Sequence, residues 1–211
     1  PPVSAAAVPG VFANGSVDPV RLADANARAT AGRNYTWTAR LRRTDGRTGH
    51  RVVDATRRAR VDAEGTLVTD RGFPEFPANQ TVYLTDRQAY RRLRGIGTSM
   101  RLDVTRVDRR YVFAESLLRF NLRAGDYRTR AVERDGVRSL RLEYPPNGSA
   151  PADGTGNYTA TLFVTREGFV RRFSVGFTDL RGDRVSLRFR YTAVGTTAVS
   201  TPGWVARLRA N

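Results

Sequence analysis

Two side-chain types that often carry catalysis, cysteine and histidine, are missing or rare in this sequence. The 211 residues include no cysteine, which excludes thiolate nucleophiles, disulfides and cysteine-ligated zinc. A single histidine, His50, lies in a turn-like stretch, so the usual general base and most transition-metal sites are also missing. The GIG stretch at 95–97 lacks the third glycine and the following helix of a phosphate-binding loop. We therefore expect a protein that is not an enzyme and that uses no metal or cofactor.

Arg171 is the one charged residue in an unexpected place. It falls in phase with Phe169, Phe173 and Phe177 along an alternating run. A β-bulge just after Gly168 would turn it outward, and this alternative is favoured. In the other alternative it points inward at the rim of a cavity, where it is a candidate for pairing with an anionic head group.

Charge is the strongest feature of the composition. The formal net charge is +16, the pI is about 11.4, and all 36 basic residues are arginine. They are spread from Arg21 to Arg209, which favours a solvated, charge-laced strand surface over a dedicated polyanion site. Polyanion binding stays open as a third function, and it predicts an affinity that falls steeply with salt.

Five Asn-X-Ser/Thr sequons predict an exported glycoprotein. They use five of the eight asparagines, namely Asn14, Asn34, Asn79, Asn147 and Asn157. Such sites accept N-linked glycans on the surface of secreted proteins. No apolar run is long enough to span a membrane, and the chain begins at Pro1 rather than Met. We expect a processed or trimmed start, with any signal or anchor upstream.

Two helices and a long alternating region are predicted. Asp18 as N-cap, Pro19 at the first helical position and Gly32 as the stop define the first helix. A second, short helix falls within 114–125. Period-two alternation then predicts strands, separated by Gly-containing hairpin signals, over 35–42, 53–61, 140–144, 158–164, 169–177 and 185–191.

The two ends of the chain receive separate predictions. Residues 1–16 are small and proline-containing and are expected to form a flexible tether. Residues 17–205 form a single domain and 206–211 a C-terminal tail. Within the closing stretch, Thr196–Ser200 is expected to add a last edge segment of the sheet before Pro202 ends the pairing.

This order of elements predicts an α+β fold. One-sided alternation is typical of antiparallel strands, and a strongly curved sheet forms a half-open barrel with the helices at its open side. Its apolar face is either a packed core or the wall of a lipid-sized cavity. Phe73 and Phe76 either close over this face as a flap or tuck under a sheet edge. The predicted lining residues are Trp37, Leu41, Phe73, Phe76, Phe113, Leu118, Phe173, Phe177, Phe189 and Tyr191.

Three stretches resemble a known family. They are PGVFANGSVDPVRLADANARATAGRNYT, ATLFVTREGFVRRFSVGF and RVSLRFRYTAVGTTAVSTPGWV. From about Pro9 to Val205 the chain resembles haloarchaeal surface lipoproteins, which are similar to the bacterial and mycobacterial lipid carriers of the LolA, LppX and LprG type. The resemblance implies a half-open barrel, and a signal peptide and lipid-modified cysteine upstream of Pro1. The strongly basic charge departs from the acidic surfaces typical of haloarchaea.

The function expected from these features is the binding or transfer of an apolar ligand. The domain would hold a lipid or lipid-linked molecule as a monomer, tethered by an upstream lipid anchor to the outer face of the cytoplasmic membrane, with no specific nucleic-acid partner. The alternative is a structural or interaction module of the cell surface. Such a module would have a filled core and an arginine-rich face for acidic partners.

Overall fold

The computed structural model describes residues 2–72, 79–93, 98–102, 114–134, 136–144 and 156–210. The chain divides into two compact units, each made of three segments. Unit 1 comprises Pro1–Ala31, Arg42–Val52 and Phe113–Arg190, and unit 2 comprises Gly32–Leu41, Val53–Val112 and Tyr191–Asn211.

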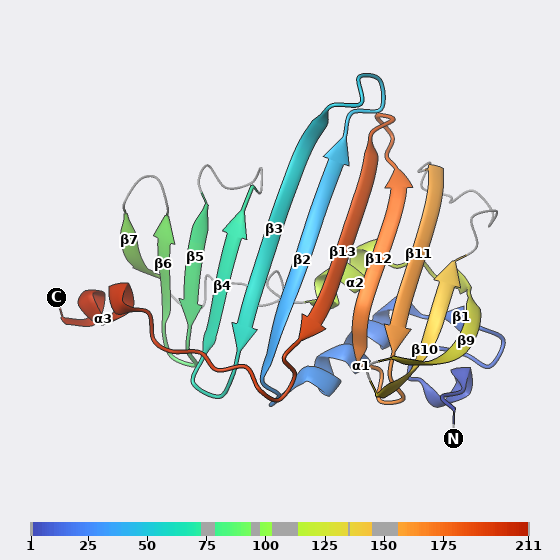
Figure 1. Ribbon diagram of the computed structural model, residues 1–211, viewed down its shortest axis with the longest axis horizontal. Helices are drawn as coiled ribbons and strands as arrows, with labels where there is room; N and C mark the ends of the chain where they lie inside the picture. The colour runs from blue at the N-terminus through green and yellow to red at the C-terminus, as the bar shows by residue number, and fades with distance from the viewer. Residues whose placement is uncertain are drawn as a thin grey trace. The chain divides into compact units, whose positions relative to one another are not determined.

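The fold is α+β and antiparallel, as predicted (Figure 1). Eleven strands form the larger sheet in the order β7-β6-β5-β4-β3-β2-β13-β12-β11-β10-β9, and β1 pairs with β8 in a small second sheet. The helices are η1 (Ala5–Ala7), α1 (Pro19–Thr30), α2 (Ala114–Asn121) and α3 (Gly203–Ala210). The strands are β1 (Ser16–Val17), β2 (Tyr35–Thr44), β3 (Arg51–Val61), β4 (Thr66–Arg71), β5 (Gln80–Leu84), β6 (Ala89–Leu93), β7 (Ser99–Leu102), β8 (Gly125–Asp126), β9 (Arg128–Arg134), β10 (Val137–Tyr144), β11 (Gly156–Val164), β12 (Val170–Thr178) and β13 (Arg184–Thr192). The predicted N-terminal helix and short second helix are confirmed, whereas closure into a half barrel stays a prediction.

Helix α1 of unit 1 begins as the sequence predicts. The Asp18 side chain accepts hydrogen bonds from the backbone N–H groups of Val20 and Arg21, both at 3.0 Å. These bonds satisfy two of the donors that a helix start leaves free, and Pro19 adds a preset φ at the first position. The helix ends at Thr30, and Gly32 follows with a φ of 68°.

The small-residue face of α1 lies directly on the start of β12. A Cβ on Gly168 would come within 2.5 Å of the Ala25 Cβ, so only glycine allows this approach. Asn26 is fully buried, and its side-chain oxygen accepts a hydrogen bond from the Val170 N–H at 2.9 Å. Shape and one buried hydrogen bond therefore fix α1 against the sheet of unit 1.

Helix α2 packs against α1 in the same unit, and both lie behind β12 in the view of Figure 1. At its C-terminal end, the Asn121 carbonyl accepts a hydrogen bond from the Tyr158 hydroxyl at 2.8 Å. Tyr158 in turn packs edge-on against Tyr144, with ring centroids 5.1 Å apart. Burial raises the pKa of the Tyr158 hydroxyl, so this phenol stays protonated and keeps its donor role.

Glu115, in the first turn of α2, supports a prediction about pH. Burial raises the pKa of its carboxyl above the usual value, outweighing the attraction of Arg119. The folded state therefore binds more protons than the unfolded chain, and stability falls as pH rises from the unfolded pKa through the raised folded pKa. We expect Glu115→Gln to raise the Tm by a few degrees at pH 7 and to leave it unchanged at about pH 3.

Thermal unfolding followed by circular dichroism at the two pH values checks this expectation. Glu133→Gln is the matched control, because that carboxylate is exposed on β9. A gain for Glu115→Gln that persists at low pH, or an equal gain in the control, would contradict the burial argument.

Unit 2 packs the C-terminal segment on β4–β6. Its core cluster combines Tyr83 and Tyr90 with Val199, Trp204 and Val205. The Tyr83 hydroxyl also forms a hydrogen bond with the Thr201 hydroxyl at 3.2 Å. The prediction of an edge segment at Thr196–Ser200 is wrong, because this stretch forms no strand. Burial of Val199 and Trp204 holds it in place instead of backbone pairing.

The chain ends contain structure that the sequence did not predict. Within the stretch predicted as a tether, Val8 and Val11 are buried, and Val11 forms an isolated bridge with Val17. Helix α3 includes 206–210 of the predicted tail. The division into tether, domain and tail stays a prediction. Among the described residues, no helix is long and apolar enough to cross a membrane.

Candidate functional site

The aromatic face predicted from the sequence is assembled in unit 1 on β12 and β13. Phe173 and Phe189 are directly opposite each other in the register, and their ring centroids are 5.3 Å apart. Both rings are buried, as is Leu118 of α2. Four residue pairs further along the register, Phe177 lies opposite Val185, and both are only half-buried. The apolar face thus changes from buried to partly exposed along the two strands.

The remaining predicted lining residues lie elsewhere. In unit 2, Trp37 is buried and Leu41 is half-buried on β2. Tyr191 packs edge-on against Tyr35 in the same unit, with centroids 5.0 Å apart. Three predicted residues lie outside the described part of the chain: Phe73, Phe76 and Phe113.

Arg171 lies at a bulge, which was the favoured alternative. In the register, Phe163 is opposite Arg172 and the next residue, Val164, is opposite Val170. Arg171 is therefore the extra residue of β12, half-buried between the buried Val170 and the outward Arg172. Its role toward a head group stays a prediction.

The sequons differ in exposure. Asn14, Asn79 and Asn157 are exposed, Asn34 is half-buried, and Asn147 lies outside the described residues. Asn14 accepts hydrogen bonds from the Ser16 N–H and hydroxyl, at 3.1 and 2.8 Å. Its side-chain nitrogen, to which a glycan would attach, is not used by these bonds. Glycosylation at the five sequons stays a prediction.

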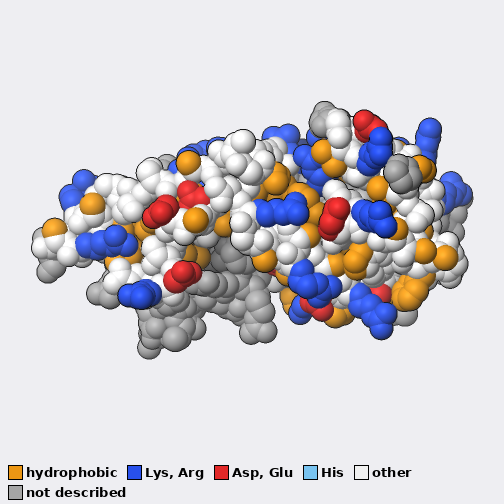
Figure 2. Space-filling model, turned by 90° about the horizontal axis from the view of Figure 1, so that it is seen from below, with side chains coloured by type: hydrophobic (Ala, Val, Ile, Leu, Met, Phe, Trp, Pro, Cys, Tyr) orange, Lys and Arg blue, Asp and Glu red, His pale blue; other side chains and the backbone are white. Residues whose placement is uncertain are grey.

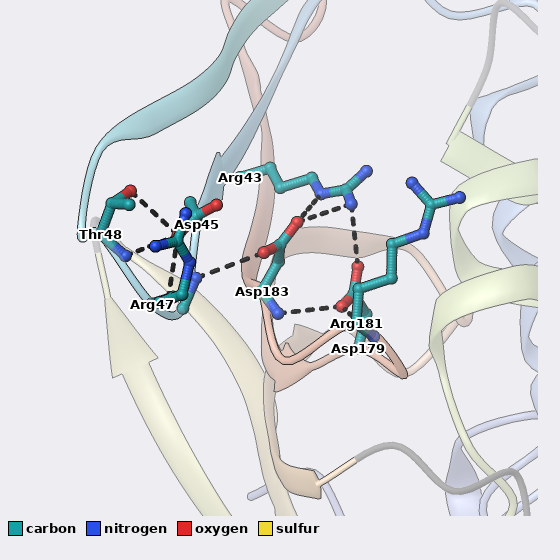
Figure 3. A network of polar contacts seen from close by, with 8 residues as sticks. Arg43, Asp45, Arg47, Thr48, Asp179, Arg181 and Asp183 are labelled. Atoms are coloured by element: carbon teal, nitrogen blue, oxygen red, sulfur yellow. Dashed lines mark hydrogen bonds and ion pairs between the residues drawn. The ribbon is translucent and has the colours of Figure 1, made fainter.

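A polar network ends the apolar face of unit 1 (Figure 3). Asp183, two residues before Val185 on the same face, accepts hydrogen bonds from Arg43 Nε at 2.6 Å and from the Gly46 N–H at 3.2 Å. Arg43 Nη2 also lies 3.5 Å from an oxygen of Asp179. The network joins the turn after β2 to the turn after β12, so polar groups follow directly on the half-buried apolar pair.

The RGD sequence at 181–183, which could suggest an adhesion motif, lies in this second turn. The Asp179 N–H donates to the Asp183 carbonyl at 2.9 Å, and the Gly182 N–H donates to the Asp179 carbonyl at 2.9 Å. The Asp183 carboxylate accepts a hydrogen bond from Arg43, and the Asp183 residue is only 9% exposed. It is therefore not presented to a partner as an adhesion motif requires.

A buried ion pair in unit 2 was missed by the sequence analysis. Arg57 on β3 donates from Nε and Nη2 to the two oxygens of Asp70 on β4, at 2.6 and 3.1 Å. Gln80 on β5 donates from Nε2 to Asp70 Oδ2 at 2.9 Å. The signal was present in the sequence, because Arg57 is in phase with Ala55 and Ala59 on an otherwise apolar side of the run.

Acidic and basic side chains are otherwise scattered. On the face seen in Figure 2 they are interspersed with apolar and uncharged side chains and do not form one continuous patch. Within the described ranges, no group of three or more His, Cys, Asp or Glu side chains could hold a metal ion.

Comparisons with known proteins find similar solved structures but assign the chain to no family. No family model matches the chain, and no curated protein matches it significantly. The crystal structure of a LolA superfamily protein from Nitrosomonas europaea matches with a TM-score of 0.36 and 12% identity, covering 87% of this chain and 97% of that one. The lipoprotein LppX from Mycobacterium tuberculosis matches with a TM-score of 0.42 and 12% identity, covering 87% and 98%. The haloarchaeal affiliation stays a prediction.

Proposed function

We propose that unit 1 binds an amphiphilic lipid along the aligned faces of β12 and β13. The observation that carries this proposal is the change in exposure along these strands. Phe173 and Phe189 are buried, Phe177 and Val185 are half-buried, and polar groups follow. An acyl or isoprenoid chain lying on the half-buried pair would remove that apolar surface from water, which is favourable at about 25 cal/mol per Å².

The polar network at the end of this face suits the head group of such a lipid. Arg43 and the Gly46 N–H already donate to Asp183, so a head group would bind here by sharing or displacing that carboxylate. Arg171 lies six residues from Phe177, about 20 Å along an extended strand. Arg171 and the polar network therefore lie at opposite ends of β12.

The sequence supplies the setting of this proposal. The five sequons and the resemblance to surface lipoproteins support a setting outside the cytoplasmic membrane, where we propose that the domain is a monomer held by an upstream lipid anchor. In that setting a lipid-binding domain could hold or transfer its ligand at the membrane surface.

Lipid extraction followed by mass spectrometry of the purified chain is the first test, and titration with the fluorescent fatty acid cis-parinaric acid is the second. We expect Phe177→Ser to weaken binding of this probe about tenfold, because the apolar contact between the Phe177 ring and the bound probe is lost. The matched control is Leu180→Ser, since Leu180 is exposed in the adjacent turn of the same unit.

Two outcomes would contradict the proposal. One is a purified protein with no bound lipid that also fails to bind the probe. The other is an equal loss of binding in Phe177→Ser and Leu180→Ser, which would place the probe away from the half-buried pair.

A further inference from the structure

Two turns of unit 1 lie side by side at one end of its strands (Figure 1). The region they form, residues 42–52 and 179–185, is here called the turn end. The two turns are in direct contact, because a Cβ on Gly46 would clash with the Gly182 carbonyl oxygen. The Gly46 N–H also donates a hydrogen bond to the Asp183 carboxylate at 3.2 Å. The turn end is therefore one connected surface.

The carboxylates of the turn end are held by hydrogen bonds within the turns. Asp45 accepts hydrogen bonds from the Thr48 N–H and hydroxyl, at 2.6 and 2.9 Å. Asp179 accepts from the N–H groups of Arg181 and Asp183, at 2.9 and 3.0 Å. The third carboxylate, that of Asp183, belongs to the network of Figure 3. The acidic side chains therefore fix the shape of the two turns.

Apolar and basic side chains are exposed together at the turn end. Leu180, at a central position of the second turn, is 78% exposed, and Val52, just after the first turn, is 56% exposed. Three arginines of the turn end are exposed as well: Arg47, Arg181 and Arg184. Turn positions are usually filled by Gly, Pro, Asn, Asp or Ser, so the turn itself does not require a bulky apolar residue such as Leu180.

Charge at the turn end is positive even when every internal ion pair is counted. Its residues include six arginines and three aspartates, with no lysine or glutamate, which gives a net charge of +3. This sum includes Arg43 together with its two partners, Asp179 and Asp183, so the excess does not depend on any arginine lacking a partner. Anionic membranes attract such a surface, and an apolar side chain inserted among the head groups strengthens the attachment.

We propose that the turn end docks on an anionic membrane surface, with Leu180 inserted among the lipid head groups. The inference deepens the proposed function and rests on it for the identity of the cargo. Phe177 and Val185, the half-buried pair, lie within two residues of either side of the second turn. A lipid that left the membrane at Leu180 would therefore reach this pair directly.

A protein partner fits the turn end less well than a membrane. Stable protein interfaces bury about 1,200 Å² or more around a core enriched in aromatic side chains. The turn end contains no Phe, Tyr or Trp, and its exposed large apolar side chains are Leu180 and Val52. Reversible attachment to a membrane needs no such core, because charge and an inserted side chain act together.

Co-sedimentation of the full chain with lipid vesicles in about 0.15 M salt tests the proposal. We expect vesicles of equal parts phosphatidylglycerol and phosphatidylcholine to bind the chain at least tenfold more tightly than vesicles of phosphatidylcholine alone. Leu180→Ser should weaken binding to the mixed vesicles about tenfold, because the inserted apolar side chain is lost. Arg181→Gln/Arg184→Gln should weaken it by about the same factor, because two charges are removed.

Each of these variants has a matched control in unit 1. Phe120→Ser removes an apolar side chain that is 81% exposed on α2. Arg130→Gln/Arg166→Gln removes two charges from exposed positions on β9 and in the turn after β11. Both controls should bind the mixed vesicles as the parent does. The Tm of all four variants should stay close to that of the parent, because the substituted side chains are exposed.

Each other result overturns the proposal. Equal weakening by the two arginine variants would mean that net charge alone attracts the chain to lipid, and equal weakening by Phe120→Ser would place the insertion elsewhere. No binding to the mixed vesicles would remove the site altogether. Tighter binding of polyglutamate that does not depend on Leu180 would assign the turn end to an acidic protein. Binding of cis-parinaric acid is measured without vesicles, so the proposed function stands or fails on a separate readout.

Discussion

Replacing Asp70 by alanine is expected to lower the free energy of unfolding by about 3–5 kcal/mol, because it breaks a buried ion pair. The side chains of Asp70 and Arg57 are only 4% and 15% exposed. Without the carboxylate, the Arg57 guanidinium loses two hydrogen bonds and Gln80 Nε2 loses one. Urea unfolding followed by fluorescence measures this loss.

The chain offers a close control for this experiment. Arg40 and Asp54 also form a paired hydrogen bond in unit 2, with both distances at 2.8 Å. Their side chains are 47% and 25% exposed, so Asp54→Ala should lower stability much less than Asp70→Ala does. A similar cost for both variants would show that burial does not set the strength of the Arg57–Asp70 pair.

A second control separates the charge from the packing. The double variant Arg57→Met/Asp70→Leu removes both charges while keeping much of the side-chain volume. Replacing a buried ion pair with apolar residues of similar volume often leaves protein stability unchanged or even raises it. We expect this variant to recover most of the stability lost in Asp70→Ala, and failure to do so would point to packing rather than to an uncompensated charge.

The elements that the sequence predicted well are those with local signals. The start of α1 depends on Asp18 and Pro19, which act within one turn of the helix. The strands around Trp37 and Phe173 alternate in sequence because one face is more deeply buried than the other. The turns that join neighbouring strands also contain a glycine beside an acidic residue, as at Gly182.

The missed elements lack such local signals. Strand β9 is the edge of its sheet and exposes nearly all of its side chains, so its sequence RTRAVER shows no alternation. Helix α3 has a weak apolar stripe, and it forms where Trp204 and Val205 can pack on Tyr83 and Tyr90. Such contacts between residues over a hundred positions apart cannot be seen in a local pattern.

The sequence predicted which residue types form the candidate site, but it did not predict how those residues pair across the strands. Alternation identified Phe173, Phe177 and Phe189 as one face, yet only the pairing of β12 with β13 shows which rings meet.

Phe173→Ala is expected to cost about 3–5 kcal/mol of unfolding free energy, the usual loss when a buried aromatic leaves a cavity. Phe173 is 2% exposed and packs on Phe189, and its neighbours can close the space only in part. Phe177→Ala on the same face should cost clearly less, because that ring is already half-exposed. Chemical unfolding of both variants, with Phe173→Leu as a conservative control expected below about 1.5 kcal/mol, makes the comparison.

The two phenylalanine variants also distinguish core from ligand surface. If Phe177 contacts a lipid, its alanine variant should lose cis-parinaric acid binding while keeping most of its stability. Phe173→Ala should show the reverse order, with a large loss of stability and, in the folded fraction, binding close to that of the parent. Equal stability losses at the two positions would mean that Phe177 belongs to the packed core, and the ligand surface would then have to be sought elsewhere in the chain.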